Sequence, residues 1–304
     1  MKKKILIVGG TGFIGYHLAL KAKKKGWNVT SISSKPPKKL RFIPKIKYII
    51  CDISKKKLLQ KKINKSYDYV VNLGGYVDHS KKKKTYNSHY LGCKNLTKIF
   101  MKKPPKSFVQ MGSCIEYGFN QSPQKETIKT NIKNLKSVYG QAKLKATNHL
   151  INLFEKNKFP SIIFRLYLTY GPKQEVNRFL PIIIDGCLKN EKFRCSSGKQ
   201  LRDFVHVYDV IGAIFKSLNN KKAFGEIINI GSGKPQKIKN VILLIRKIIG
   251  KGGPQFGKIK LRKDEILKLY PNINKARKKI NWTPKIDFNR GLKGTILYYK
   301  NLYN

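Results

Sequence analysis

Residues 4–15 read KILIVGGTGFIG, a stretch that combines an apolar run with three regularly spaced glycines. Its first half is an almost uninterrupted apolar run, which is typical of a strand buried on both faces of a parallel sheet. Glycines then recur at every third position, at Gly9, Gly12 and Gly15. Over residues 13–25 the apolar side chains take helical spacing and the last turn is basic, as at the end of a helix. The stretch therefore predicts a strand, a tight glycine turn and a helix in direct succession.

The glycine turn predicts a binding site for a dinucleotide. In such turns one glycine permits the sharp bend, another lets the backbone approach a diphosphate, and the third allows helix and strand to pack closely. The unpaired N–H groups at the helix N-terminus attract the phosphate charge. A purely structural glycine turn is the alternative, but a position between a strand and a helix is the context that a dinucleotide site requires.

The rest of the chain continues the alternation of strands and helices. Strand-like segments are 27–32, 47–53, 67–75, 107–113, 161–170 and 226–233, and helical patterns lie near 56–64, 86–102, 137–157, 177–190, 237–250 and 289–301. This alternation predicts an α/β fold with a doubly wound parallel (Rossmann) sheet, which binds ligands beyond the carboxyl ends of its strands.

The pattern also predicts a division of the chain, because segments past residue 172 become shorter and more mixed. We expect a dinucleotide-binding Rossmann domain over 1–172, with a returning segment near 204–232. Residues 173–304 are expected to form a smaller α/β lobe for the substrate.

Composition excludes several classes of protein. The chain of 304 residues is 40% hydrophobic, which is globular rather than disordered. No apolar run reaches the roughly 20 residues that cross a bilayer, and the apolar N-terminal run lacks a signal-peptide cleavage site, so we expect a cytoplasmic protein without a membrane span. The five cysteines form no CxxC pair and no His cluster accompanies them, so neither a metal site nor a disulfide framework is expected.

The net charge of +51 raises the question of a nucleic-acid partner. Lysines occur in nearly every segment and greatly outnumber arginines, whereas surfaces that read phosphates or bases concentrate their charge and favour arginine. A compositionally biased proteome with A/T-rich codons accounts for the charge better. We therefore expect no specific nucleic-acid partner, but non-specific attachment to polyanions at low salt.

The GxxGxxG spacing resembles the extended short-chain dehydrogenase/reductase family. Asp52 after the third strand and the LGG of 73–75 after the fourth also match it, and the tail NWTPKIDFNRGLKGTI (281–296) resembles the C-terminal signature of its nucleotide-sugar epimerases, dehydratases and reductases. The resemblance implies a homodimer that binds a nicotinamide dinucleotide and a nucleotide-diphosphate sugar. The cofactor-binding residues expected from the motif and the resemblance are Gly9, Gly12, Phe13, Ile14, Gly15, Ser33, Ser34, Lys35, Asp52, Ile53, Leu73, Gly74, Gly75, His89, Tyr139 and Lys143.

The end of the second strand bears on which dinucleotide binds. An acidic residue there would accept hydrogen bonds from the adenosine ribose and repel a 2′-phosphate. This chain has Ser33, Ser34 and Lys35 instead. Hydroxyls and a cation favour NADP(H), and NAD(H) remains the alternative because lysine is common throughout the chain.

Tyr139 and Lys143 form the sequence YGQAK and fall one helical turn apart on the same face. A neighbouring ammonium stabilises a phenolate, so we expect Lys143 to lower the pKa of Tyr139. The tyrosine could then exchange a proton with the sugar while hydride moves to or from the nicotinamide. The family resemblance adds Ser113, which would hydrogen-bond the reacting oxygen, and implies that Lys143 also holds the nicotinamide ribose.

Residues 111–118, MGSCIEYG, bear on the type of reaction. Sugar dehydratases that this chain resembles carry an Asp–Glu pair directly after the serine or threonine, whereas here Cys114 and Ile115 occupy those positions. Glu116 follows, but strand alternation would turn it to the opposite face. A dehydratase is therefore not expected, and a reductase or an epimerase remains.

The resemblance also implies substrate contacts. Arg202, in LRDFVHV, matches a family arginine that meets the substrate diphosphate, and Arg178 is a weaker candidate; a structural Arg202–Asp203 pair is the alternative. Two positions depart from the family pattern, since Leu168 and His89 stand where asparagines are frequent. Residues 170–172 are expected to form the hinge between the lobes.

These observations leave three hypotheses. The first is a 4-keto-sugar reductase that uses NADPH, with Tyr139 as proton donor. The second is a nucleotide-sugar 4-epimerase that holds NAD tightly. The third is a non-catalytic relative that binds a dinucleotide or RNA, which an intact set of Ser113, Tyr139 and Lys143 disfavours.

Overall fold

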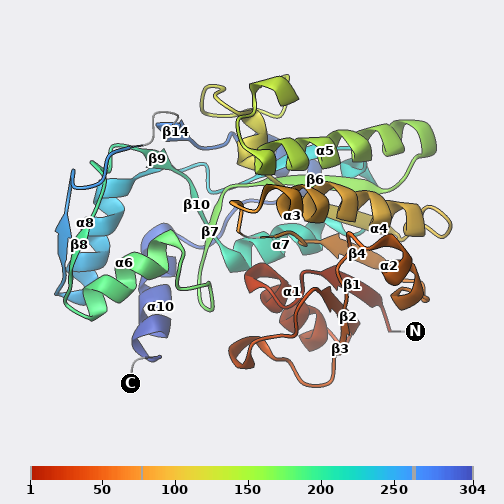
Figure 1. The fold of residues 1–304 in the computed structure, drawn as a ribbon, viewed down its shortest axis with the longest axis horizontal. Helices are drawn as coiled ribbons and strands as arrows, with labels where there is room; N and C mark the ends of the chain where they lie inside the picture. The colour runs from red at the N-terminus through yellow and green to blue at the C-terminus, as the bar shows by residue number, and fades with distance from the viewer. Residues whose placement is uncertain (1, 77, 262–264, 303–304) are drawn as a thin grey trace.

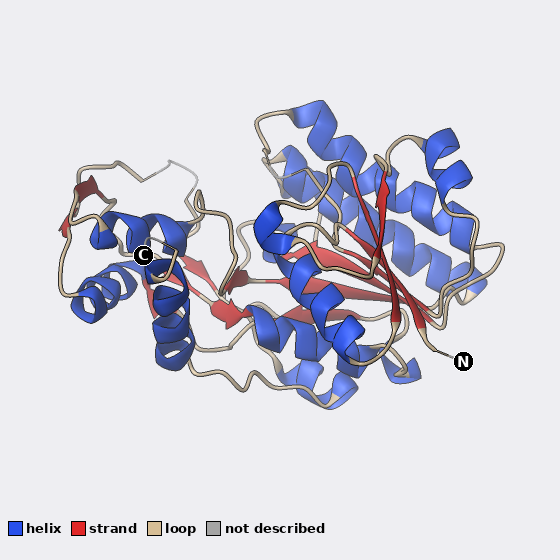
Figure 2. Ribbon diagram, turned by 90° about the horizontal axis from the view of Figure 1, so that it is seen from below, coloured by secondary structure: helices blue, strands red, loops and turns tan. Residues whose placement is uncertain are grey.

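The computed structural model describes residues 2–76, 78–261 and 265–302. A larger part is built around a central sheet, and a smaller part of helices and short strands lies at its end (Figure 1). The N-terminus belongs to the larger part and the C-terminus to the smaller one (Figures 1 and 2).

Seven strands of the described chain form one parallel sheet. They are β1 (Lys4–Val8), β2 (Asn28–Ser33), β3 (Lys47–Ile50), β4 (Tyr69–Asn72), β5 (Ser107–Ser113), β6 (Ser161–Leu166) and β11 (Ile227–Ile230). Their order is β11-β6-β5-β4-β1-β2-β3, so the chain first winds outward from β1 to β3 and then continues on the other side of β1. This is the doubly wound sheet that the alternation predicts, with its reversal of direction beside β1.

Helices cover both faces of this sheet (Figure 2). They are α1 (Phe13–Lys24), α2 (Lys56–Lys62), α3 (Lys82–Tyr86), α4 (Gly92–Phe100), α5 (Val138–Asn157), α7 (Val207–Ser217) and α9 (Asn274–Ile280). Alternate residues of β1 enter opposite cores because side chains alternate along a strand. Ile5 and Ile7 pack in the core that includes α1 and α7, whereas Leu6 and Val8 pack in the core that includes α2, α4 and α5.

The predicted helix over 86–102 begins earlier than expected. Helix α3 passes through a π-helical turn over Asn87–Leu91 into α4, so helical structure runs from Lys82 to Phe100. Such π-turns are frequent at functional sites. This one carries His89.

The smaller part is held by α6 (Phe179–Leu188), α8 (Ile238–Ile249) and α10 (Phe288–Lys300), which share one hydrophobic core. Short strands complete it: β7 (Leu168–Tyr170) pairs with β10 (Phe204–His206), β12 (Gln236–Lys237) and β14 (Lys268–Leu269) flank β9 (Leu201–Arg202), and β8 (Lys192–Arg194) pairs with β13 (Gly253–Gln255). The single strand predicted over 161–170 is thus divided into β6 and β7, because β7 pairs with β10 and not with the central sheet.

Helix α7 is absent from the sequence-based expectations, although its apolar residues have helical spacing. Its residues Val210, Ile211 and Ile214 are buried in the core beside α1. The C-terminal segment is then tied to α7, since Trp282 Nε1 donates to the carbonyl of Asp209 at 3.0 Å. The strand β11 and helices α7 and α9 bring chain from beyond residue 172 onto the central sheet, and the domain boundary near that residue stays a prediction.

The five cysteines are buried free thiols. Within residues 2–76, 78–261 and 265–302, no three or more His, Cys, Asp or Glu side chains gather as a metal site would require. No helix in the same ranges is long and apolar enough to cross a membrane.

Candidate functional site

The glycine loop between β1 and α1 has the geometry of a phosphate cradle. Gly9 takes a left-handed φ of +78°, which an L side chain rarely adopts. A Cβ on Gly15 would lie 2.2 Å from the Gly9 carbonyl oxygen, so only glycine lets the helix approach the strand this closely. A Cβ on Gly12 would meet that same oxygen at 3.2 Å. No side chain of the described residues caps the N-terminus of α1, so its first N–H groups face outward for an anionic ligand.

The carboxyl end of β2 lies against this loop. Thr11 donates its backbone N–H to Ser33 Oγ at 3.3 Å and its hydroxyl to the Lys35 carbonyl at 3.5 Å. Ser33, Ser34 and Lys35 are thereby held beside the glycines, where an adenosine ribose would lie in a fold of this type. No acidic side chain occupies residues 33–35.

The loops after β3 and β4 complete this edge of the sheet. Asp52 accepts the Ser54 N–H at 2.9 Å and keeps an exposed side chain. The side chain of Ile53 lies under Gly74, where an added Cβ would come within 3.3 Å of Ile53 Cδ1. Gly75 is in closer contact, because a Cβ there would lie 1.8 Å from the ring of His89. The predicted residues after the first four strands therefore meet along one edge.

These features fit a nicotinamide dinucleotide. Its diphosphate would lie on the loop of Gly9, Gly12 and Gly15, with Phe13 and Ile14 in the first turn of α1, and its adenosine would lie beside Ser33, Ser34 and Lys35. Bound there, such a cofactor supplies a hydride acceptor and donor.

The candidate catalytic residues come from β5 and α5. Ser113 is the last residue of β5, and Ser137 caps α5 by accepting the Gly140 N–H at 3.0 Å. This start places Tyr139 in the first turn of α5 and Lys143 one turn later, with Lys143 Nζ 5.8 Å from the centre of the Tyr139 ring. A side-chain hydrogen bond joins Ser113 and Tyr139. The structure therefore brings together the three residues that the sequence predicts.

The predicted effect on Tyr139 is wrong for this structure. Burial raises the pKa of Tyr139 to about 12, although its hydrogen bond with Ser113 acts in the opposite direction. Lys143 donates to the Met111 carbonyl at 2.6 Å instead of to the phenol oxygen. Burial also lowers the pKa of Lys143 to about 8, with the charge of Glu116 opposing that shift. The ammonium is thus held under Tyr139, but the phenol remains protonated.

Two histidines enclose Tyr139, and only His89 is expected there from the sequence. His79 stacks on the Tyr139 ring with centroids 4.0 Å apart, and the His89 ring meets its edge at 5.0 Å. His89 Nε2 contacts the Tyr76 carbonyl at 3.3 Å, whereas its buried Nδ1 has no partner among the described residues. Burial lowers the pKa of both histidines, so both are neutral near pH 7. The position of His79 just after the predicted cofactor loop is the signal that could have indicated it.

The turn after Ser113 differs from the expectation of continued strand. Residues Cys114–Tyr117 form a 3₁₀ helix, so strand alternation does not determine their directions. Burial raises the pKa of the Cys114 thiol to about 12, which leaves it protonated and unsuited to proton transfer at neutral pH. Glu116 does turn away from the substrate side, but through this helix, and it is completely buried.

The two candidate substrate arginines differ in their surroundings. Arg178 immediately precedes α6. Its positive charge lowers the pKa of Tyr139, which opposes the effect of burial, and lowers the pKa of His79, which adds to the effect of burial. Arg202 forms an ion pair with Glu265 and lies near Cys114. The alternative of an Arg202–Asp203 pair does not occur, because the Asp203 carboxylate accepts from the backbone and hydroxyl of Ser232.

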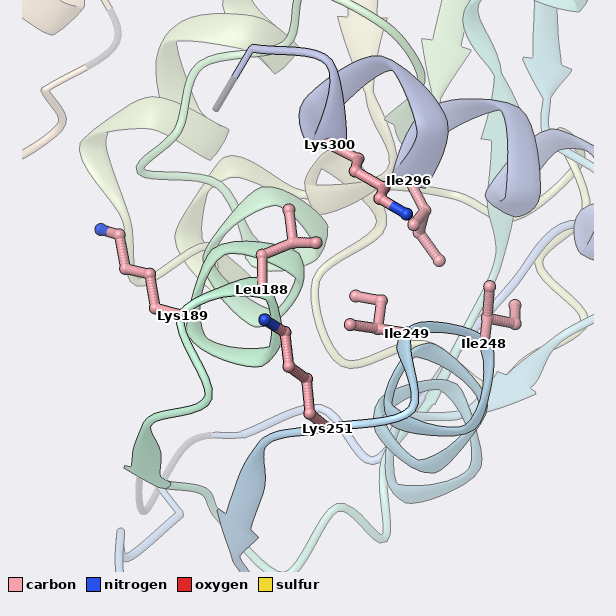
Figure 3. A pocket seen from close by; sticks show the side chains of 7 residues that line it. All are labelled: Leu188, Lys189, Ile248, Ile249, Lys251, Ile296 and Lys300. Carbon is pink, nitrogen blue, oxygen red and sulfur yellow. The ribbon is translucent and has the colours of Figure 1, made fainter. Parts of the chain in front are cut away.

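A separate hollow lies in the smaller part, between α6, α8 and α10 (Figure 3). Its volume is about 420 Å³ and its lining is Leu188, Lys189, Ile248, Ile249, Lys251, Ile296 and Lys300. None of the predicted site residues belongs to this lining. The candidate site is therefore the edge of the sheet around Tyr139 and not this hollow.

Comparisons with known proteins agree with this geometry. The family described as "NAD dependent epimerase/dehydratase family" matches residues 5–231. A relative from Methanocaldococcus jannaschii with the provisional name UDP-glucose 4-epimerase is 28% identical over 311 residues, which cover 98% of each chain.

Two solved structures have the same fold. The UDP-glucose 4-epimerase of Thermotoga maritima, determined with UDP-glucose, has a TM-score of 0.92 at 23% identity and covers 99% of both chains. The UDP-glucose 4-epimerase of Thermus thermophilus, determined with NAD, has a TM-score of 0.87 at 20% identity and covers 97% of this chain and 98% of that one.

Proposed function

The chain belongs to the NAD-dependent epimerase/dehydratase family, and from this premise we propose that it is a nucleotide-sugar 4-epimerase that keeps a nicotinamide dinucleotide bound through its cycle. Membership confirms the predicted enzyme class, an extended short-chain dehydrogenase/reductase that acts on nucleotide sugars. The 4-keto-sugar reductase becomes the second candidate, because a relative that matches over 98% of both chains carries an epimerase name.

The observation that carries the proposal is the lack of a carboxylate pair directly after Ser113. Tyr139 lies between Ser113 and Lys143, and the positions after Ser113 hold Cys114 and Ile115 instead of a carboxylate pair. A dehydratase needs a further acid and base to eliminate water, whereas an epimerase needs one group that removes a proton from a hydroxyl and later returns it. The site has Tyr139 as such a group and lacks the carboxylate pair of a dehydratase, so it suits an epimerase better than a dehydratase.

In the proposed reaction, Tyr139 acts in its phenolate form. The phenolate oxygen accepts the proton of the sugar hydroxyl and returns it after the keto sugar has rotated to present its other face. Ser113 donates a hydrogen bond that orients the same sugar oxygen. Lys143 provides the positive charge that stabilises the phenolate, which requires its ammonium to act on Tyr139 more strongly than in this structure. His79 and His89 limit the access of water to the Tyr139 ring.

The substrate we propose is a nucleotide-diphosphate sugar. Arg178 lies near Tyr139 and would meet the sugar or its phosphates, because a guanidinium suits phosphate oxygens. Arg202 would bind the diphosphate by exchanging its ion pair with Glu265. We also propose a cytoplasmic homodimer that pairs through the helices near 86–102 and 137–157. The domains would divide near residue 172.

One observation favours the reductase as a second candidate. Ser33, Ser34 and Lys35 lie beside the glycine loop, where an enzyme that selects NAD typically has an acidic residue. A preference for NADP(H) would suit a reductase, which takes up and releases its cofactor in each turnover.

The experiment that tests the proposal is identification of the cofactor. Purified protein is denatured, and the released nucleotide is identified by mass spectrometry and absorbance. Stoichiometric NAD supports the epimerase. An empty protein that binds NADPH more tightly than NADH contradicts it and supports the reductase.

Turnover then tests the catalytic assignment. The protein is incubated with UDP-glucose and related nucleotide sugars, and the 4-epimers are resolved by chromatography. Tyr139→Phe should abolish turnover and leave cofactor binding nearly unchanged, because it removes only the phenol oxygen. Normal turnover in this variant would show that Tyr139 is not the acid–base group.

A further inference from the structure

Glu116 is a completely buried carboxylate directly behind Ser113. Its Oε1 accepts the backbone N–H of Ser113 at 2.7 Å. Its Oε2 accepts from the hydroxyl of Thr147 at 2.8 Å and from Arg165 Nε at 3.1 Å. Residue 112 is glycine, and a Cβ there would lie 2.5 Å from Glu116 Oε1. The last residues of β5 therefore leave room for this carboxylate.

These hydrogen bonds connect the strand that carries Ser113 to the helix that carries the other two candidate residues. Tyr139, Lys143 and Thr147 are spaced by four residues along α5 and lie along one face of it. Glu116 hydrogen-bonds Thr147, the third of these positions, and also the backbone of Ser113 at the end of β5. Glu116 thus links the backbone of Ser113 to α5 through one side chain.

The carboxylate also places a negative charge under the site. Arg165, on β6, forms a buried ion pair with Glu116 and stacks over the ring of Tyr117 at 4.3 Å. Arg165 Nη1 has no hydrogen-bond partner in the described ranges, so this pair is not fully satisfied. The charge of Glu116 raises the pKa of Lys143 against the larger effect of burial, and it adds to burial in raising that of Tyr139.

Other titratable or charged groups face the same residues. Five such groups of the described chain act on Lys143 or Tyr139. They are His79 in the loop after β4, His89 in η2 (Asn87–Leu91), Cys93 in α4, Cys114 in the turn after β5 and Arg178 at the start of α6. Burial lowers the pKa values of the two histidines and raises those of the two cysteines, so these four groups are neutral near pH 7. Among the described residues, Glu116 therefore supplies the negative charge that acts on Lys143 and Tyr139.

We propose that Glu116 is a positioning residue of the reaction proposed above: it fixes Ser113 against α5 and places a buried carboxylate behind the candidate catalytic residues. The inference rests on the proposed function for its catalytic meaning. A merely structural carboxylate would support folding without affecting the ionisation of the site.

The test uses substitutions that separate charge from position. Glu116→Gln removes the charge and retains the shape, and Glu116→Asp retains the charge with a shorter reach. Thr147→Val removes the bond to α5 and leaves the ion pair intact. Glu126→Gln is the matched control, because Glu126 is a partly buried carboxylate whose hydrogen bond goes to the Asn229 backbone.

The readout is the pH dependence of kcat for the 4-epimerisation. Removing the charge should lower the pKa values of Lys143 and Tyr139 together, so the whole profile of Glu116→Gln should move to lower pH with a reduced maximum. Glu116→Asp and Thr147→Val should reduce kcat at the wild-type pH optimum, and Glu126→Gln should leave the profile unchanged. A Glu116→Gln profile with lower amplitude but the wild-type pH midpoints would overturn the proposal. Normal turnover in Thr147→Val would also overturn it, and this result can be obtained even if Glu116→Gln fails to fold.

A second measurement needs no sugar substrate. The protein is labelled with carbon-13 lysine, the Lys143 signal is assigned with Lys143→Arg, and its titration is followed by NMR in wild type and Glu116→Gln. A Lys143 titration that moves to lower pH in the variant supports the inference even if no nucleotide sugar is turned over. A lack of turnover would count against the proposed function alone. An unchanged titration refutes the charge effect.

Discussion

Substitution of Gly15 by alanine should damage both the stability and the cofactor site, and the size of the loss follows from the backbone contacts. The new Cβ would lie 2.2 Å from the Gly9 carbonyl oxygen and 2.6 Å from Gly10 Cα. Both are backbone atoms that cannot rotate away. Overpacking of this kind costs about 3 kcal/mol at the upper end of the usual range, and the better helix propensity of alanine returns about 1 kcal/mol. The expected net loss is about 2 kcal/mol.

Gly12→Ala is the matched control on the same loop. Its Cβ would meet the Gly9 oxygen at 3.2 Å, so the fold should accept it with a loss of about 1 kcal/mol or less, from the weaker N-cap. The methyl would nevertheless stand at the N-terminus of α1, where we expect the diphosphate. Loss of one charge-assisted hydrogen bond there, about 1.5–3 kcal/mol, weakens cofactor binding by about 10- to 150-fold.

Differential scanning calorimetry and cofactor titration distinguish the two variants. A loss of about 2 kcal/mol lowers Tm by about 3 °C for a chain of 304 residues. Gly15→Ala should therefore show a clearly lower Tm together with weakened binding, whereas Gly12→Ala should show weakened binding with Tm nearly unchanged. Wild-type Tm and affinity in Gly15→Ala would refute the close-approach argument, and wild-type affinity in Gly12→Ala would refute the placement of the diphosphate.

Two further predictions concern buried charge. Arg165→Met leaves the Glu116 carboxylate buried without its partner, so urea unfolding should show a loss of about 3–5 kcal/mol; a loss below about 1 kcal/mol would mean that the pair contributes little. His206 caps α7 by accepting the Tyr208 N–H at 3.3 Å, and burial lowers its pKa from 6.5 to about 4. Because the unfolded chain binds this proton more readily, about 3 kcal/mol of stability is present above pH 6.5 and is lost as the pH falls toward 4. His206→Asn, a cap that does not titrate, should reduce this dependence in denaturation curves, and equal curves for both proteins would contradict it.

Much of the fold could be predicted because it depends on local patterns. The apolar run before Gly9, the glycine spacing and the helix ending near Gly26 are all contained within one βαβ unit. Tyr139 and Lys143 could be predicted as a pair for the same reason, since their separation is one turn of a single helix.

The features that the sequence did not reveal depend on contacts between distant segments. His79 reaches Tyr139 only through the path of the loop after β4, and Arg202 meets Glu265 across the small sheet. The pKa of Tyr139 was predicted in the wrong direction because burial outweighs the nearby ammonium, and burial is not contained in a four-residue spacing. Glu116 was placed by strand alternation, which ends where the 3₁₀ helix begins.

The order of the sheet has a consequence for synthesis of the chain on the ribosome. Strand β11 is the outer neighbour of β6, yet it is translated only after the chain has built α6, α7 and several short strands. Until residue 230 has emerged, the nascent sheet ends at β6, whose apolar residues Ile162–Phe164 would present an open edge. Such an edge can pair with another growing chain, so the interval between the synthesis of β6 and β11 is when the nascent chain is open to aggregation at this edge.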